Sequence, residues 1–336
     1  MNKLFMCLKE ASSGAQKRHC VLCMMIVFAL LTGCSSQYEP DALDSVIETV
    51  DDSVTENDAD SSQSAVYTEN SSSDESKDSS GESADVLKVQ VLKVGKADAM
   101  VLTCGESTMI IDCGEEEDGL EVLKYLEGQG ISEVDVLMIT HFDKDHVGGA
   151  DTVVEGIPVK RVILPSYAGT GTDYMDFMAA LDQAGITPEN VTENIAFDLG
   201  CASVLVEPPA SYEIPEDETE YDNNFSLITT VLCHGKRLVF TGDIQKQRIR
   251  EWLAGSAVTT CDVLKVPHHG VYNTSLEELF KTLSPKYAVI CDSKKNMADE
   301  RTIELLKQCG ADCLETCYGD ITILCSESGL EIHQLT

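Results

Sequence analysis

Basic residues are scarce in this 336-residue sequence, which has 24 Lys and Arg against 58 Asp and Glu and a formal net charge of −34. An acidic surface repels polyanions, so the composition excludes a protein that captures nucleic acid by overall charge attraction. A glycine-rich phosphate loop, a Gly-x-Ser-x-Gly serine elbow and a Gly-x-Gly-x-x-Gly fingerprint are also absent. These absences argue against P-loop NTPases, serine hydrolases and dinucleotide-dependent dehydrogenases.

The apolar run near the N-terminus is short. Residues 20–31 form an uncharged stretch of 12 residues, whereas a bilayer-spanning helix needs roughly 20. Lys17 and Arg18 precede this stretch and Leu-Thr-Gly-Cys34 ends it, a layout typical of a signal peptide over residues 1–33. The last four residues resemble the bacterial lipobox, which implies cleavage before Cys34, lipidation of its thiol and an anchor on the extracytoplasmic face of the cell membrane. An uncleaved membrane helix is the alternative.

Apolar side chains are nearly missing from the next segment. Residues 35–85 hold 15 Asp and Glu, one basic residue (Lys77) and several serine runs. Such a composition buries too little to fold and its charges repel one another, so residues 34–85 are expected to form a disordered tether behind the lipidated cysteine. Residues 86–336 are expected to form the folded domain, which keeps 42 acidic and 19 basic residues and a net charge of −23.

The folded part has ten cysteines, which in an exported protein raises the question of disulfides. Their spacing argues against disulfides, because several lie in apolar runs where a thiol acts as a small hydrophobe, but the sequence alone does not decide whether any of the ten pair. Cys309, Cys313 and Cys317 are close together but lack the paired Cys-x-x-Cys knuckles of a zinc ribbon. The spacing therefore does not favour a structural metal there.

Strand-like and helical patterns alternate along residues 86–336. Strands are expected at 86–94, 100–103, 108–111, 134–140, 162–164, 203–206, 225–233, 237–241, 263–266, 287–291, 321–325 and 330–334. Helices are expected at 119–127, 174–184, 244–253, 276–283 and 300–308, where apolar residues recur at three- and four-residue spacing. Short turns at 104–107 and 234–236 predict antiparallel hairpins. The pattern predicts an α/β sandwich of two sheets with helices outside.

Four of the six histidines in residues 86–336 fall in two short segments, 140–149 and 266–270. The first segment places His141, Asp143, Asp145 and His146 within six residues and closes on paired glycines. Charge this dense at the end of an apolar strand is tolerable only beside cations, and imidazole with carboxylate suits Zn, Mn or Fe. The alternative is that these histidines are capping or core residues.

The His-x-Asp-x-Asp-His-x-Gly-Gly spacing resembles the metal-binding signature of the metallo-β-lactamase superfamily, with aspartate in place of the middle histidine. Segments 94–99, 110–114, 223–227, 240–243 and 264–270 follow in an order that resembles the metallo-hydrolase domain of ComEC-type competence proteins. This resemblance implies a four-layer αββα sandwich with mixed sheets, hydrolase activity and two divalent metal ions, Zn or Mn. The sequence departs from the family motif at Lys96 and Ala97, where Gln and Gly are usual. It also lacks the isolated histidine that the wider superfamily has before Asp243, and its Asn-Asn-x-Ser pattern at 223–226 favours the ComEC-type branch.

The resemblance also implies a ligand set. His141 and Asp143 would bind the first metal, and Asp145 and His146 the second. Asp243 would bridge the two, and either His268 or His269 would complete the second site. Asp145, Asp243 and His269 are the catalytic candidates, and the alternative for Asp243 is a helix N-cap. Candidates to support the ligands or contact substrate are Asp98, Asp112, Asn224, Ser226 and Lys265, with Lys144 as a second possible oxyanion or phosphate contact.

Two such cations, roughly 3.5 to 4 Å apart, would generate a hydroxide for hydrolysis. The resemblance points to a phosphodiester substrate, either nucleic acid or a small molecule. Hydrolysis of small esters, lactones or lactams is the second hypothesis, and a noncatalytic DNA- or ligand-binding lipoprotein is the third. Membrane lipid is the other expected partner, through Cys34, and no protein partner is predicted. One cluster of basic residues could bind the phosphate backbone of nucleic acid: Lys236, Arg237, Lys246, Arg248 and Arg250. The alternative is that these residues form a solvated hairpin and helix face.

Overall fold

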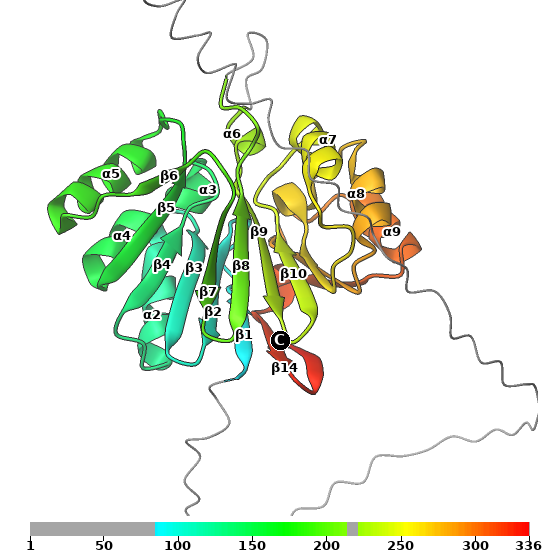
Figure 1. The fold of residues 1–336 in the computed structure, drawn as a ribbon, viewed down its shortest axis with the longest axis horizontal. Coiled ribbons are helices and arrows are strands. Elements are labelled where there is room, and N and C mark those ends of the chain that lie inside the picture. Colours follow the sequence, from blue (N-terminus) through cyan, green and yellow to red (C-terminus); the bar gives the residue numbers. More distant parts are fainter. Residues whose placement is uncertain (1–84, 214–220, 336) are drawn as a thin grey trace, which may run out of the picture. The chain divides into compact units, whose positions relative to one another are not determined.

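The computed structural model describes residues 85–213 and 221–335 (Figure 1). The expected signal peptide, Cys34 and nearly all of the tether lie outside the described residues. Among the helices of the described ranges, none is long and apolar enough to cross a membrane.

The first sheet has eight strands in the order β15-β14-β1-β2-β3-β4-β5-β6. Neighbours from β3 to β6 are parallel and the others are antiparallel. The strands are β1 (Leu87–Val91), β2 (Ala99–Cys104), β3 (Ser107–Cys113), β4 (Val134–Met138), β5 (Val159–Pro165), β6 (Glu189–Val191), β14 (Ile321–Ser326) and β15 (Gly329–Gln334).

The second sheet has seven strands in the order β13-β12-β11-β10-β9-β8-β7. Here β10 to β13 are parallel, while β7, β8, β9 and β10 form an antiparallel meander. The strands are β7 (Ile195–Leu199), β8 (Ala202–Glu207), β9 (Ile228–Cys233), β10 (Lys236–Phe240), β11 (Val263–Lys265), β12 (Tyr287–Ile290) and β13 (Asp312–Glu315).

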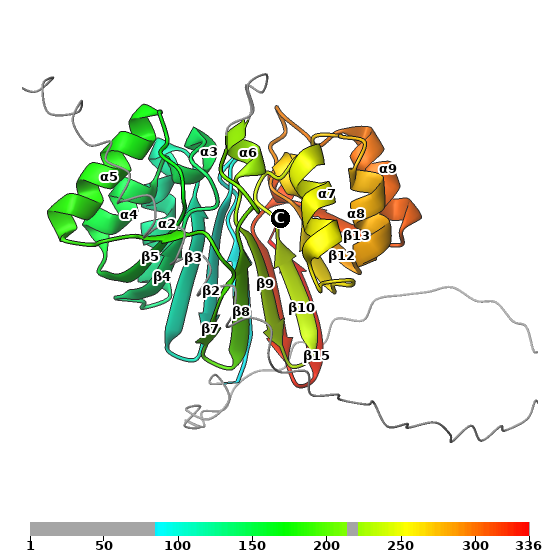
Figure 2. The ribbon, with the colours of Figure 1, turned by 45° about the horizontal axis from the view of Figure 1, so that its top comes forward.

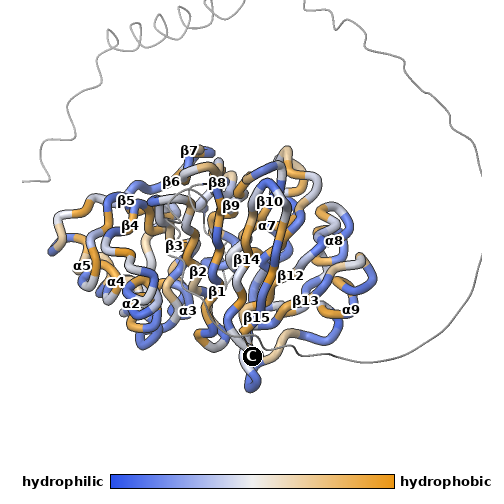
Figure 3. The backbone as a smooth tube through the Cα atoms, turned by 90° about the horizontal axis from the view of Figure 1, so that it is seen from below, coloured by the Kyte–Doolittle hydropathy of each residue, from blue (hydrophilic) through white to orange (hydrophobic). Residues whose placement is uncertain are grey.

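Three separate apolar clusters establish four layers. One lies between the sheets, with residues such as Leu102 and Val204 from opposite sides. The second lies under the helices α2 (Gly119–Gly128), α4 (Ala150–Gly156) and α5 (Thr172–Ala184), and the third under α7 (Lys246–Gly255), α8 (Leu276–Leu283) and α9 (Glu300–Gln308). Figure 2 shows these two helical layers on the outer faces, and Figure 3 shows hydrophobic segments along the central strands. The expected αββα sandwich is confirmed.

The loops at one end of the sandwich contain short helices and 3-10 turns. They are α3 (Lys144–Val147), α6 (Tyr221–Asn224) and the 3-10 turns η1 (Glu116–Asp118), η2 (Pro267–Gly270) and η3 (Thr316–Tyr318). The expected strand at 225–233 is shorter than predicted and begins at Ile228. Its first residues form a turn instead, because the N–H of Phe225 donates to the Asp222 carbonyl and the N–H of Ser226 to that of Asn223.

The sequence patterns missed β6, β7, β13 and α4. The edge strand β7 alternates between exposed positions and buried or partly buried ones over only five residues, too short a period-two pattern to stand out in the sequence. The helix α4 has seven residues, too few for a helical period to stand out.

Candidate metal centre

The sequence-predicted metal residues meet where the strands of both sheets end. Parallel neighbours in a sheet share one carboxyl end, so the loops after β10 and β11 lie together. The loop after β4 of the other sheet meets them, because His146 Nε2 lies 3.3 Å from Asp243 Oδ2. The loop after β4 supplies His141 and His146 from the first sheet. The loops after β10 and β11 supply Asp243 and His269 from the second sheet. The centre therefore spans the two halves of the sandwich.

Three imidazoles at the centre are fully or almost fully buried and held in one orientation. Their Nδ1 atoms lie against Thr140 Oγ1 for His141 (3.1 Å), Asp112 Oδ2 for His146 (2.8 Å) and the Cys291 carbonyl oxygen for His269 (2.9 Å). Their Nε2 atoms are buried without a hydrogen-bond partner. Anchoring one ring nitrogen and presenting the other is how proteins orient a metal-binding histidine.

Carboxylates surround these Nε2 atoms. Asp243 Oδ2 lies 3.3 Å from His146 Nε2 and 3.1 Å from His269 Nε2. Asp145 Oδ2 lies 3.4 Å from His269 Nε2, and Asp143 Oδ2 lies 3.5 Å from His141 Nε2. Donor atoms lie within 4.8 Å of one another in two groups that share His146: His141, His146 and Asp243; and Asp145, His146 and His269. The six residues suit two adjacent cations.

His268 does not join this cluster. Both His268 and His269 have a left-handed backbone, with φ of 49° and 53°, in η2. Their ring centroids lie 6.2 Å apart, and His269 alone of the pair belongs to a donor group. Of the two alternatives left open by the sequence, the geometry therefore favours His269 for the ligand position.

Lys265 lies behind the donor atoms. Its side chain is 1% exposed, its Nζ forms an ion pair with Asp98, and the same atom lies 3.4 Å from Asp243 Oδ1. The prediction that Lys265 contacts an oxyanion or phosphate is therefore wrong, because its ammonium group is buried between the carboxylates of Asp98 and Asp243. Lys144 is exposed and pairs with Glu115 at 2.9 Å.

The remaining predicted supporting residues divide into two kinds. Asp112 accepts hydrogen bonds from Thr140 N and Oγ1, both at 2.7 Å, besides holding His146. Ser226 Oγ accepts the N–H of Asp243 at 3.2 Å and so positions the bridging candidate. Asn224 serves a helix instead, because its Oδ1 accepts the N–H of Arg248 in α7 at 3.3 Å. The N-cap of α7 is Gln245, so the alternative of Asp243 as the cap is wrong.

Electrostatics make the centre attractive to cations. Burial alone would lower the pKa of His269, but Asp243 and Asp145 beside it raise that pKa to about 9. Burial likewise lowers the pKa of His146, while Asp243 and Asp112 raise it well above its usual value. Without metal, the carboxylates thus draw protons to the imidazoles, and cation binding at neutral pH would release them.

Several contributors could not be recognised from the sequence. Thr140 stands directly before the metal loop, which is a weak signal for its role between Asp112 and His141. The Cys291 carbonyl gives no sequence signal. Beside the loop, the Phe142 ring lies 4.7 Å from Tyr167, whose ring lies 4.9 Å from Phe225. These three aromatic residues are far apart in sequence, so their grouping was not predicted.

Comparisons with known proteins place the chain as follows. The model of the Metallo-beta-lactamase superfamily matches residues 92–291. ComE operon protein 3 of Bacillus subtilis is 29% identical over 199 residues, which cover 58% of this chain and 25% of that protein. Recombination protein 2 of Haemophilus influenzae is 26% identical over 222 residues, covering 62% and 24%. The chain thus matches about a quarter of each relative. Among solved structures, the metallo-beta-lactamase fold protein YhfI of Bacillus subtilis has a TM-score of 0.49 at 9% identity, covering 74% of this chain and 100% of that one.

Proposed function

The chain belongs to the metallo-beta-lactamase superfamily, and we propose that this hydrolase uses two divalent cations, Zn or Mn, to cleave phosphodiester bonds. The cations would supply a hydroxide near neutral pH and polarise the bond to be cleaved. His141 and Asp143 would hold one cation, Asp145, His146 and His269 the other, and Asp243 both. Asp112, Ser226 and Lys265 keep these ligands in place through the contacts described above.

The observation that carries this proposal is the set of three buried, unpartnered Nε2 atoms facing carboxylates. A buried polar atom without a hydrogen-bond partner is costly, and the two cations together would relieve all three Nε2 atoms. The charge balance of the centre supports two cations rather than one. The centre gathers five carboxylates, and Lys265 compensates one of them. Four negative charges remain, equal to the charge of two divalent cations when the histidines are neutral. The carboxylates are Asp98, Asp112, Asp143, Asp145 and Asp243.

Support for a phosphodiester substrate comes from the relatives. One of them is named for recombination and the other for the competence operon. The oxygen-rich first site, with one histidine and two carboxylates, suits harder cations such as Mn²⁺. Hydrolysis of small esters, lactones or lactams remains the second candidate.

The predicted basic surface for nucleic acid is wrong for one of its five residues, Arg248. Arg248 is 3% exposed, donates to Glu251 Oε1 at 2.7 Å and to the Glu207 carbonyl oxygen at 2.9 Å, and so cannot contact a phosphate. Lys246 and Arg250 are exposed on α7. With few exposed cations available, binding would depend chiefly on the metals, because Phe142 and Phe225 beside the loop are 6% and 4% exposed and cannot stack on bases.

The test is a substrate panel with Mn²⁺, Mg²⁺ and Zn²⁺. We expect cleavage of single-stranded DNA or a small phosphodiester, and its loss with the metals in Asp243→Asn. Arg250→Glu should flatten the dependence of cleavage on salt, since each phosphate contact contributes about −0.9 to the log–log slope on duplex DNA. Lys281→Glu, on the exposed face of α8, is the matched control. Turnover of only a lactone or a cephalosporin would move the assignment to the second candidate. Metal binding without any turnover would favour a binding protein.

We further propose that the protein is anchored to the extracytoplasmic face of the cell membrane by lipid on Cys34. The support is the run of 12 apolar residues before it, shorter than the roughly 20 of a spanning helix. Cys34→Ser should abolish fatty-acid labelling and release the protein from membranes. Tight retention of an unlabelled variant would contradict the lipid anchor.

A further inference from the structure

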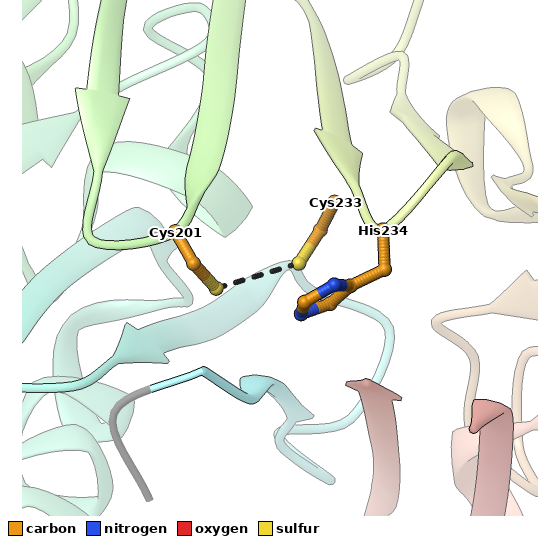
Figure 4. Close-up of side chains that lie close together, drawn as sticks. All are labelled: Cys201, Cys233 and His234. Carbon is orange, nitrogen blue, oxygen red and sulfur yellow. Dashed lines mark hydrogen bonds between the residues drawn. The ribbon is translucent and has the colours of Figure 1, made fainter. Parts of the chain in front are cut away.

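A second group of metal-ligating side chains lies at the opposite end of the sandwich from the hydrolytic centre. Cys233 and His234 stand just before β10, whereas Asp243 follows that strand. Cys201 stands in the turn between β7 and β8, next to the β9–β10 turn in the sheet. Figure 4 shows the two thiols and the imidazole side by side on these two hairpin turns. No residue of the hydrolytic centre takes part.

The spacing of the donors suits one cation. Cys201 Sγ lies 3.6 Å from Cys233 Sγ, and the two sulfur atoms and a ring nitrogen of His234 lie within 4.8 Å of one another. Two thiolates on one tetrahedral zinc ion, each about 2.3 Å from it, stand about 3.8 Å apart. A disulfide would require about 2.05 Å, and no disulfide joins the ten cysteines of the described residues. The observed separation, an S–H···S contact without metal, matches the spacing of two ligands on one ion, so an ion could bind without moving the two strands.

His234 is oriented as a ligand would be. Its Nε2 lies 2.6 Å from the carbonyl oxygen of Asp85. A carbonyl can only accept, so Nε2 carries the proton and Nδ1 keeps a lone pair. A histidine that donates one ring N–H to a backbone carbonyl presents the other nitrogen to a metal.

We propose that Cys201, Cys233 and His234 form a second, thiolate-containing metal site that takes one thiophilic divalent cation such as Zn²⁺. Cys201 and His234 are exposed, so the ion can enter from solvent and a water can complete the tetrahedron. Binding of the cation would displace the proton of each thiol. The ion would join two hairpins to Asp85, where the described chain enters the domain. This role is structural and does not depend on the proposed hydrolysis.

The experiment uses Co²⁺ as the probe, added to metal-free full-length protein under a thiol-free reductant. Thiolate-to-cobalt charge transfer appears in the near-ultraviolet, and the hydrolytic centre, which has only nitrogen and oxygen donors, contributes none. We expect this absorption in the wild type and its bleaching by one equivalent of Zn²⁺. Cys201→Ser and His234→Asn should lose it while keeping the hydrolytic metals, and the total zinc per chain should fall by one.

The variants are chosen to keep the fold. Cys201 is exposed, and asparagine tolerates the left-handed φ of 47° at position 234. Cys309→Ser removes a half-buried thiol outside the group and should keep the absorption. The proposal is overturned if the wild type shows no charge transfer or if Cys201→Ser keeps it. A Cys201–Cys233 disulfide in protein purified without reductant, which would leave two fewer titratable thiols, would also overturn it.

Discussion

Replacing Lys265 by methionine tests whether its buried ammonium holds the hydrolytic centre together. Methionine has a similar length and no charge, so the cavity stays filled while the ion pairs with Asp98 and Asp243 are lost. At the 3.4 Å between Lys265 Nζ and Asp243 Oδ1, two charges attract by roughly 5 kcal/mol at an effective dielectric constant of about 20. Removing the ammonium also removes its desolvation cost, but both carboxylates stay buried.

The expected net loss in the free energy of unfolding is about 3–5 kcal/mol for metal-free Lys265→Met, the usual cost of breaking a buried ion pair from one side. The loss should be smaller in the metal-loaded protein, because the cations then compensate Asp243. Urea unfolding of chelator-treated and metal-loaded protein measures both values. Lys281→Met is the control, since Lys281 forms an exposed pair with Glu277 and should leave stability unchanged. Equal stability of the two metal-free variants would refute a structural role for Lys265.

Three further outcomes are expected. Asp112→Asn should weaken metal binding about 10- to 100-fold in competition with a chelator, because Asp112 orients His146; unchanged affinity would remove that role. Gly149→Ala should lower the free energy of unfolding by roughly 1–3 kcal/mol, because the added Cβ would lie 2.5 Å from both the Cys113 carbonyl oxygen and the Gly119 nitrogen. Gly128→Ala is the control and should not destabilise the protein, since no atom lies within 4 Å of its Cβ. Burial raises the pKa of Cys261 from 9.0 to about 12. The stability that this buried thiol contributes is therefore complete below pH 9 and is lost as the pH rises toward 12. The free energy of unfolding, measured from pH 8.5 to 10.5, should fall more steeply in the wild type than in Cys261→Ala.

The sequence predicted best what is close together in the chain. The four metal-loop residues were found because they occupy six consecutive positions, and Asp243 because it follows an apolar run and a glycine. The sequence could not decide between His268 and His269, because the left-handed backbone of these two residues in η2 determines which ring faces the carboxylates. No periodicity encodes that backbone.

Contacts between distant segments were also missed. Arg248 reads as a surface cation in sequence, but the carbonyl of Glu207 on β8 lies 2.9 Å from its guanidinium and holds it inside. The pairing of Cys201 with Cys233 needs β8 beside β9, which sequence spacing alone does not give. Such neighbours follow from strand order, and strand order is set by packing of the whole sandwich.

The division of the hydrolytic donors between the two sheets has a consequence for the folding of the chain. Contacts between segments distant in sequence form slowly, after local hairpins and helices. Until the two sheets dock, His141 and His146 are separated from Asp243 and His269, and neither half has a complete donor set. Metal capture at the proposed centre would then follow docking of the two sheets, and we expect the fraction of chains that hold metal to report how many have docked correctly. A chain stalled before docking would expose the apolar inner faces of both sheets, which are buried against each other in the folded domain.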